Sequence, residues 1–510
     1  MTAAREPRLA RLGPALAALA VFLLHAACWG RYGIFRDELY FLVCGERLAA
    51  GYVDQPPGIA LVARLGSALF GTSVPGLRLF AWLASAGTVY LAGRLAARLG
   101  GGAAGAALAA VATASCPVLL GTSSFLSMNA FEPLLVLSAV VVLLRLSQGE
   151  DPRLFLAAGG LLGLAVLFKY TAAVLALALL AGLVLTPARR ALRTLWALAG
   201  GVFGLLVVLP NFAWQASHGF PFLELVHNQV LYKNVPTSPL SFLLQLLLQA
   251  NPLNAPIWLG GLAWLLVAAR TRAARFLGVG GLLQLALLAA GHAKPYYAIS
   301  ILPVLLAAGG AALAVLVASR WARRVYGGAL VALTLAFSPM AVPILPLKTF
   351  LAYQGALDLH SRSDERLSQS ALPQLYADQL GWHELVAGVA RAYASLPPGE
   401  QEHAAVFAQN YGVASAVQIL GPAHGLPRGI AVSGHNQYWF WGLPPGRGDP
   451  VIVVSDPEEN CDLFYRERQL FERLPSIPHV MPYEDRHSLW ICRGARQPLR
   501  GLPPSVRHFE

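Results

Sequence analysis

Charged residues are scarce in this chain of 510 residues. They make up 13% of the sequence, whereas hydrophobic residues make up 56%, and a soluble protein of this length cannot give such a composition enough polar surface. This balance excludes an ordinary soluble enzyme and predicts a polytopic membrane protein. The net charge of +12 does not indicate nucleic-acid binding, because the basic residues stand in small clusters between apolar runs, where they orient helices in a membrane.

Cysteine is also rare, and the five cysteines include no close pair of the kind that builds a zinc site. A structural metal site made of cysteine is therefore not expected. Cys461 and Cys492 share the C-terminal part of the chain. A disulfide between them is expected if that part faces an oxidising compartment.

Long apolar runs are plentiful, and they predict about eleven membrane spans of the usual length. The first run follows Arg5, Arg8 and Arg11. We interpret it as a retained helix rather than a signal peptide, because it approaches the ~20 residues of a spanning helix and no small-residue cleavage site follows. The apolar runs lie near residues 12–30, 77–93, 103–121, 131–144, 154–168, 170–186, 195–212, 240–268, 276–291, 297–318 and 325–345.

The arginines between these runs predict a single orientation. If the N-terminal arginines lie in the cytoplasm, the arginine clusters of alternate loops fall on the same side. The other face of the membrane then receives the first loop, residues 31–76, and everything after residue 345. We therefore expect a cytoplasmic N-terminus and an extracytoplasmic C-terminal part.

From about residue 346 the charge rises and the long apolar runs stop. This change predicts a membrane module over residues 1–345 and a small soluble α/β domain over residues 346–510. Two segments that follow predicted strands, 409–412 and 433–439, carry polar and aromatic residues. Their position favours recognition of a sugar or an acceptor. The alternative is that they are ordinary turns packed on the membrane module. The expected helices lie at 382–395 and 461–474, and the expected strands at 404–409, 429–433, 451–455 and 487–492.

The first outer loop holds the motifs Arg36–Tyr40 (RDELY) and Tyr52–Gly58 (YVDQPPG). Asp37 and Glu38, adjacent in an extended or irregular loop, push one of their pKa values upward, so that one of them suits general-base work. The alternative is a solvated loop in which the preceding arginine pairs with a carboxylate. The two prolines stiffen the chain beyond Asp54 and favour the catalytic interpretation, unless they only start a helix.

Lys169 interrupts an apolar stretch, and Lys294 stands at the same membrane level later in the chain. A compact cation at the headgroup level suits a lipid-linked phosphate, so the two lysines together are candidates for binding a phosphate or diphosphate. The alternative is a pair of snorkelling lysines in an aromatic belt that includes Tyr297. Glu132 and His292 are further candidates for an outer cavity, although Glu132 also suits the polar start of a helix.

The two first-loop motifs, the segment Phe168–Thr171 and the segment Lys294–Tyr297 leading to Pro303 resemble family 39 membrane glycosyltransferases. These are relatives of protein O-mannosyltransferases and of the lipid A aminoarabinose transferase. The resemblance covers residues 10–345 and implies an all-α polytopic module of the GT-C fold. It implies an enzyme of the bacterial inner membrane that moves a sugar from a polyprenyl-phosphate donor to a lipid, glycan or protein acceptor on the periplasmic side.

For the site, the resemblance implies that Asp37 is the catalytic base and that Glu38 lies beside it. The aminoarabinose transferases have a lysine directly before the paired prolines, where this chain has Gln55, so the resemblance does not carry that phosphate contact over. Asp54 and Gln55 remain candidates for the cavity. The candidates for the donor phosphate are Lys169, Lys294, Arg36 and Tyr297.

A transporter or lipid flippase is the alternative, because it would also be polytopic and basic. Transporters usually show inverted repeats and interrupted helices near the membrane midplane, whereas this sequence shows no internal repeat. No cofactor is firmly implied. A divalent metal stays open, with Asp37, Glu38, Asp54, His227 and His292 as oxygen and imidazole ligands.

Overall fold

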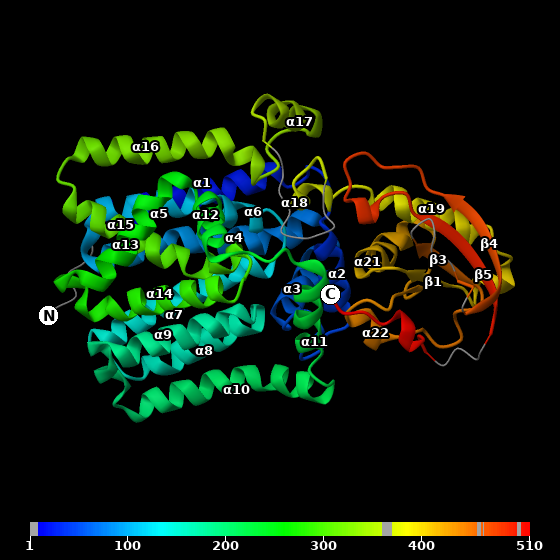
Figure 1. Ribbon diagram of the computed structural model, residues 1–510, viewed down its shortest axis with the longest axis horizontal. Helices are drawn as coiled ribbons and strands as arrows, with labels where there is room; N and C mark the ends of the chain where they lie inside the picture. Colours follow the sequence, from blue (N-terminus) through cyan, green and yellow to red (C-terminus); the bar gives the residue numbers. More distant parts are fainter. Residues whose placement is uncertain (1–8, 360–369, 456–460, 463, 497–500) are drawn as a thin grey trace.

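The computed structural model describes residues 9–359, 370–455, 461–462, 464–496 and 501–510. A large bundle of helices lies beside a smaller part that contains the β-sheet (Figure 1). Helices α2 (Arg36–Glu46), α3 (Gly58–Phe70) and α11 (Pro221–Asn228) lie between the two. Arg5 and Arg8, which helped to predict the orientation, lie outside the described residues.

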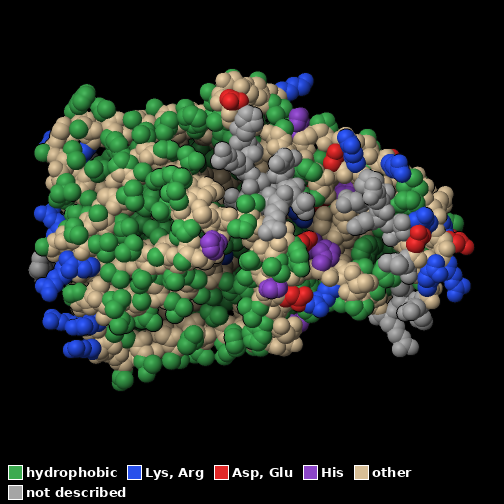
Figure 2. Space-filling model, viewed as in Figure 1, with side chains coloured by type: hydrophobic (Ala, Val, Ile, Leu, Met, Phe, Trp, Pro, Cys, Tyr) green, Lys and Arg blue, Asp and Glu red, His purple; other side chains and the backbone are tan. Residues whose placement is uncertain are grey.

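The long helices of the bundle run roughly along one direction (Figure 1). Side chains on its outer surface are largely hydrophobic, and Lys and Arg gather at the end far from the sheet (Figure 2). The helices are α1 (Leu9–Cys28), α4 (Val74–Ala96), α5 (Gly102–Ala114), α6 (Pro117–Thr122), α7 (Met128–Ser147), α8 (Leu154–Phe168), α9 (Thr171–Leu185), α10 (Leu195–Ser217), α12 (Pro239–Gln249), α13 (Ala255–Val267), α14 (Arg275–Ala290), α15 (Leu302–Leu316) and α16 (Arg320–Phe337).

Every predicted apolar run overlaps at least one of these helices, and two of the runs contain a break between two α-helices. The run 103–121 breaks at Ser115 and Cys116, between α5 and α6. The run 240–268 breaks where Asn251 takes a positive φ of 74° just before a proline, and a proline ends the preceding α-helical hydrogen bonding. Each of these two runs therefore holds two shorter α-helices.

Within the described residues, five helical stretches are long and apolar enough to cross a membrane. Six shorter apolar helices accompany them, so the predicted count of about eleven spans stays a prediction. The five stretches are Ala10–Cys28, Val74–Ala114, Met128–Ser147, Leu195–Ser217 and Ala269–Ala290.

Small residues allow the bundle helices to pack closely. At the crossing of α8 and α10, a Cβ atom added to Gly159 would lie 1.9 Å from the backbone oxygen of Gly200, and one added to Gly200 would lie 2.3 Å from the oxygen of Phe155. Only glycine fits both positions. Such backbone-to-backbone packing replaces the hydrophobic effect, which does not drive helices together in lipid.

The loop region after α1 is more regular than the sequence suggested. Asp37 and Glu38 stand in the first turn of α2 instead of an extended or irregular loop. The side chain of Glu38 accepts a hydrogen bond from the backbone N–H of Phe35 at 2.8 Å, which caps the helix. Acidic residues are favourable in a first turn because unpaired backbone N–H groups make that end of a helix positive.

The sheet has the strand order β2-β1-β3-β5-β4. Strand β1 pairs in parallel with β2 and β3, and β5 pairs antiparallel with β3 and β4. The strands are β1 (Ala405–Ala408), β2 (Ala431–Val432), β3 (Val451–Ser455), β4 (Tyr465–Arg473) and β5 (Ser488–Ala495). The helices that follow α16 in the chain are α17 (Leu347–Ala356), α18 (Gln374–Ala377), α19 (Trp382–Ala394), α20 (Pro398–Gln401), α21 (Tyr411–Leu420) and α22 (Gln437–Trp441).

The four predicted strands and the helix at 382–395 are confirmed within a few residues. The helix predicted at 461–474 is wrong, because Tyr465–Arg473 forms the edge strand β4; residue 463 of that range lies outside the described residues. The segment is rich in Arg, Glu and Gln, which are good helix formers, but pairing with β5 overrides this preference. Its exposed charges suit a sheet edge. Cys461 and Cys492 form a disulfide.

Candidate functional site

Two aspartates face the β-sheet part from the membrane module. Oδ1 of Asp37 accepts a hydrogen bond from the hydroxyl of Tyr411 at 2.9 Å, and Oδ1 of Asp54 accepts one from the hydroxyl of Tyr40 at 2.9 Å. The two tyrosine rings lie 4.8 Å apart. The carboxylates of the two first-loop motifs therefore belong to one cluster, and both are only half-buried.

The loop that carries Asp54 is fixed from three sides. The hydroxyl of Tyr52 donates to the carbonyl of Cys44 in α2 at 2.8 Å. The backbone oxygen of Tyr52 accepts from Gln215 of α10 at 2.9 Å, and the N–H of Val53 donates to Gln437 of α22 at 3.1 Å. A loop held by α2, α10 and α22 keeps its aspartate in place, as a catalytic group requires.

Burial raises the pKa of Asp54 from 3.8 to about 7, and the negative charge of Asp37 raises it further. The hydrogen bond from Tyr40 and the charge of Lys233 act in the opposite direction. A carboxyl group with a pKa near 7 gives and takes protons readily at neutral pH. Lys233 follows α11 and was not singled out from the sequence.

Glu38 points away from this cluster into the module. Its carboxylate forms a buried ion pair with Arg78 at 2.7 Å, and both side chains are 0% exposed. It also accepts from the Nε of Arg78 at 2.8 Å and from the backbone N–H groups of Leu126 at 2.7 Å and Phe35 at 2.8 Å. Four hydrogen bonds therefore occupy the two oxygens of Glu38.

Arg36 lies between α2 and the β-sheet part. Its guanidinium stacks 4.5 Å from the ring centre of Tyr411 and 4.9 Å from that of Tyr483, and its Nε lies 3.5 Å from Glu484. A Cβ atom on Gly412 would lie 2.6 Å from that Nε, so only glycine leaves room for the arginine. Arg36 joins the two parts of the molecule and is buried there.

Asp378 extends the same charged network. Its carboxylate accepts from the hydroxyl of Tyr483 at 3.0 Å. Burial raises the pKa of Asp378 from 3.8 to about 7; the negative charges of Asp37 and Glu484 contribute, and the charge of Arg36 opposes the rise. Neither Asp378 nor Tyr483 carries a local sequence signal that could have predicted this position.

Lys169 lies in a cage of tyrosine rings. Its ammonium group lies 4.7 Å from the ring centre of Tyr296 and 4.6 Å from that of Tyr297, and it donates to Oδ1 of Asn129 at 2.6 Å. The side chain is buried. Lys294 is half-buried and lies near enough for the two ammonium groups to repel each other.

The other cavity candidates are distributed around these clusters. Glu132 is 0% exposed and accepts from the hydroxyl of Thr171 at 3.0 Å. Gln55 is buried, and its amide contacts the sulfur of Cys44. His292 is exposed, and its Nδ1 lies 2.9 Å from the backbone oxygen of Thr237.

Tyr170 connects the lysine cage with the aspartate cluster. It follows Lys169 directly, and its hydroxyl bonds to Asn211 at 3.0 Å and to Gln215 at 3.2 Å. Gln215 in turn holds the loop of Asp54, and the charge of that aspartate acts on Tyr170. A cation and two carboxylates thus lie on the same side of the bundle, facing the sheet.

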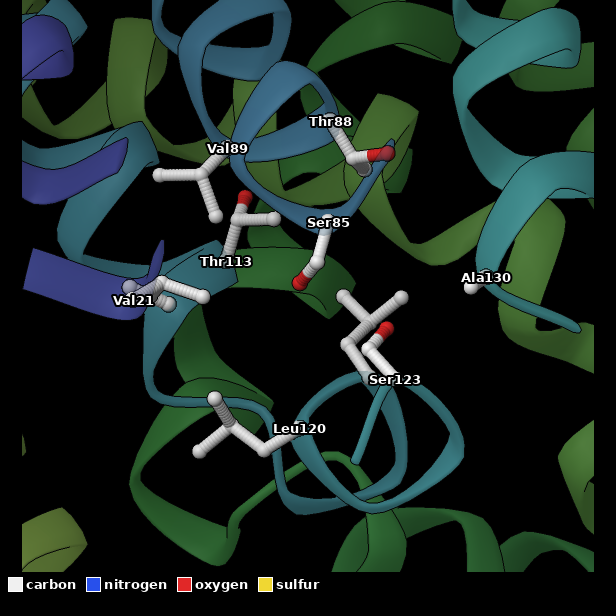
Figure 3. Close-up of a pocket in the computed structure, with 10 residues that line it drawn as sticks. Val21, Ser85, Thr88, Val89, Thr113, Leu120, Ser123 and Ala130 are labelled. Carbon is white, nitrogen blue, oxygen red and sulfur yellow. The ribbon is translucent and has the colours of Figure 1, made fainter. Parts of the chain in front are cut away.

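A separate cavity lies inside the module (Figure 3). Ser85, Thr88, Thr113 and Ser123 contribute hydroxyl groups to its wall, but the carboxylates and lysines described above do not line it. Its volume of about 10 Å³ suits about one water molecule. This cavity is too small to be the substrate site.

The comparisons with known proteins agree with this geometry. Residues 54–214 match the family model described as dolichyl-phosphate-mannose-protein mannosyltransferase. ArnT from Cupriavidus metallidurans bound to undecaprenyl phosphate aligns with a TM-score of 0.57 at 17% identity, over 96% of this chain and 98% of its own. The fold is that of a membrane glycosyltransferase.

The apo structure of the same ArnT aligns equally well, with a TM-score of 0.58 at 16% identity over 97% of this chain and 98% of its own. The glycosyltransferase fold therefore includes both the helical module and the C-terminal sheet. The predicted resemblance to family 39 and the GT-C fold are confirmed. A comparison with curated proteins finds no match.

Proposed function

We propose that this protein transfers a sugar from a polyprenyl-phosphate donor to an acceptor that enters between the membrane module and the sheet part. The observation that carries this proposal is the joint position of Asp37, Asp54 and the caged Lys169 on one side of the bundle. A transferase of this kind needs a base for the acceptor and a cation for the leaving phosphate. The ArnT structure bound to undecaprenyl phosphate supports a lipid-phosphate donor.

In the proposed reaction, Asp37 removes the proton from an acceptor hydroxyl or amine as that group attacks the anomeric carbon. The bond between this carbon and the donor phosphate breaks, and its electron pair leaves with the polyprenyl phosphate. Lys169 stabilises the charge on the leaving phosphate, with Lys294 nearby. A single displacement of this kind inverts the anomeric configuration, and NMR of the product tests it.

The role of Glu38 differs in this proposal from the one that the resemblance implied. Since its oxygens already accept four hydrogen bonds in a buried pair, we assign Glu38 to positioning α2 rather than to the reaction. Arg36 similarly holds the two parts together instead of contacting the donor phosphate. Tyr297 acts through the cage around Lys169.

The orientation also belongs to the proposal. Lys and Arg gather at the end of the bundle far from the sheet (Figure 2), which is the cytoplasmic end if the positive residues stay inside. The sheet part, with its disulfide between Cys461 and Cys492, then lies in the periplasm, where disulfides persist. The predicted boundary near residue 345 stays a prediction.

The experiment uses the purified full-length protein with radiolabelled undecaprenyl-phosphate sugars and an envelope lipid extract as acceptor. We expect Asp37→Asn to lower transfer by about 10²–10⁴-fold, the usual contribution of a general base. Lys169→Met should raise KM for the donor and lower kcat. Asp151→Asn, an exposed carboxylate in the loop between α7 and α8, is the matched control. Undiminished transfer by Asp37→Asn would overturn the assignment of the base.

A further inference from the structure

A second group of polar side chains lies beside the aspartate cluster. One imidazole nitrogen each from His435 and His508 and a carboxylate oxygen of Glu510 all lie within 4.8 Å of one another. His435 is buried, and the other two are half-buried. His435 follows β2, whereas the other two residues lie in the last described segment, 501–510.

Each histidine places one ring nitrogen beside a backbone oxygen. Nε2 of His435 lies 3.2 Å from the backbone oxygen of Glu510, and its Nδ1 is buried with no hydrogen-bond partner. Nδ1 of His508 lies 3.0 Å from the backbone oxygen of Val506. Metal-binding histidines show this arrangement, because the bond to a backbone carbonyl fixes the tautomer and directs the lone pair of the other nitrogen at the metal.

The backbone holds the two segments together without help from these side chains. The N–H of Asn436 donates to the oxygen of His508 at 3.1 Å, and the N–H of His508 donates to the oxygen of Gly434 at 3.1 Å. The two histidine rings lie 4.4 Å apart. The three donor groups are therefore already assembled, which is what a metal site needs.

We propose that His435, His508 and Glu510 bind a divalent cation of the zinc class. Two imidazoles and one carboxylate match the preference of Zn²⁺ for nitrogen and oxygen ligands, whereas Mg²⁺ and Ca²⁺ prefer oxygen alone. Three protein ligands leave one tetrahedral position for water or another oxygen ligand. The carboxylate of Glu510 offsets the charge of Lys233, which lies near His435.

The position of this site suggests what the cation does. The ring of His435 lies 5.0 Å from that of Tyr411, the tyrosine that donates to Asp37. Phe509 is 1% exposed and packs with Val53, the residue before Asp54. A cation at His435 would therefore hold residues 504–510 against the loop of Asp54.

The assembled ligands differ from those that the sequence suggested. Of the residues considered there as metal ligands, none belongs to this group, the only one of its kind among the described residues. Asp37 and Asp54 bind tyrosine hydroxyls, and Glu38 is paired with an arginine. Sequence separation hid the proposed site, because seventy-odd residues stand between His435 and His508.

The test measures metal binding and does not depend on transferase activity. The full-length protein, purified through a tag free of histidine, is stripped with a chelator, dialysed against Zn²⁺ and assayed for bound metal. We expect about one equivalent in the wild type and its loss in His508→Ala and His435→Ala. Co²⁺ should give the visible absorption of a tetrahedral nitrogen and oxygen site in the wild type only.

Exposed histidines outside the group supply the controls, since His227→Ala and His292→Ala should keep the full equivalent. Zn²⁺ should also raise the melting temperature of the wild type and leave that of His508→Ala unchanged, which separates metal loss from misfolding. Glu510→Gln keeps the size of the side chain and should weaken binding at least about tenfold. No bound equivalent in the wild type, or binding that survives the change of both histidines, would overturn the proposal.

Discussion

The two faces of α2 show how one turn of helix holds two carboxylates of opposite character. On the face toward the module, Glu38 is fully buried and accepts four hydrogen bonds, two of them from Arg78. On the face toward the sheet part, Asp37 is half-buried, and its Oδ1 accepts a hydrogen bond from the hydroxyl of Tyr411. The first carboxylate is closed to solvent, whereas the second is partly exposed.

The comparison teaches that adjacent acidic residues need not share a function. A buried ion pair fixes geometry, and its loss leaves an uncompensated charge. A half-buried carboxylate beside another carboxylate can exchange a proton with its surroundings. Glu38 cannot do so, because its carboxylate is buried in the ion pair with Arg78. The order of the residues in the motif therefore divides α2 into a structural face, which carries Glu38, and a face that is chemical in the proposed function, which carries Asp37.

The largest expected effect is a loss of stability when the ion pair on the structural face of α2 is broken. Glu38→Gln removes the charge that balances the buried guanidinium of Arg78, and we expect the free energy of unfolding to fall by about 3–5 kcal/mol. Asp37→Asn should leave the melting temperature nearly unchanged. Thermal melting of the detergent-solubilised variants measures both, and Glu46→Gln, an exposed change on the same helix, is the control. Equal melting temperatures for the two variants would contradict the division of α2.

The next effect concerns stability and pH at Asp378. In the unfolded chain its carboxyl ionises near 3.8, whereas burial in the folded protein raises its pKa to about 7. As the pH rises between these values, the unfolded state releases its proton first, so the folded state loses stability until the pH passes about 7. Asp378→Asn removes this loss and should stabilise the protein by about 2–4 kcal/mol at alkaline pH.

Melting curves at two pH values measure the effect. The gain of Asp378→Asn over the wild type should be large near pH 8 and small near pH 4, and the asparagine oxygen still accepts from Tyr483. Glu467→Gln, an exposed change on β4, should give no such dependence. A gain that is the same at both pH values would show that the charge of Asp378 is not its cause.

A smaller effect concerns Asp54, in the loop beside the chemical face of α2. Asp54 has a pKa of about 7, so in the wild type the fraction of ionised Asp54 rises through neutral pH, and transfer should rise with it. Asp54→Asn should remove this rise and lower kcat about tenfold at pH 8. The kcat of both proteins is measured from about pH 5.5 to 9. The same rise through pH 7 in Asp54→Asn would assign it to another group.

One half of this candidate site consists of residues that the sequence singled out. Asp37, Asp54 and Lys169 stand in short motifs beside apolar runs, and such local signals survive folding because they lie at helix ends and in a stiffened loop. The polytopic helical module followed from composition and from the spacing of the runs, and the GT-C fold followed from the family resemblance. These features depend on neighbouring residues, which a sequence displays directly.

The other half of the site depends on contacts between distant residues. Tyr411 lies 374 positions from Asp37, and no periodicity or motif relates the two. The buried ion pair of Glu38 could not be predicted for the same reason, because its partner Arg78 lies 40 positions away. The segment of β4 was predicted as a helix since its composition favours one, and only its pairing with β5 makes it a strand.

The smallest expected effect concerns Tyr411, at the contact between the membrane module and the sheet part. Tyr411→Phe keeps the ring that stacks on Arg36 and removes the hydroxyl that donates to Asp37. Since water can replace this donor at a half-buried carboxylate, we expect a loss of about 1 kcal/mol, or about fivefold in kcat/KM, with an unchanged melting temperature. Tyr393→Phe, which removes a hydroxyl bonded only to a backbone oxygen of Gln401, is the matched control. If Tyr411→Phe melts early and retains full kcat/KM, its hydroxyl stabilises the contact between the parts and does not orient the base.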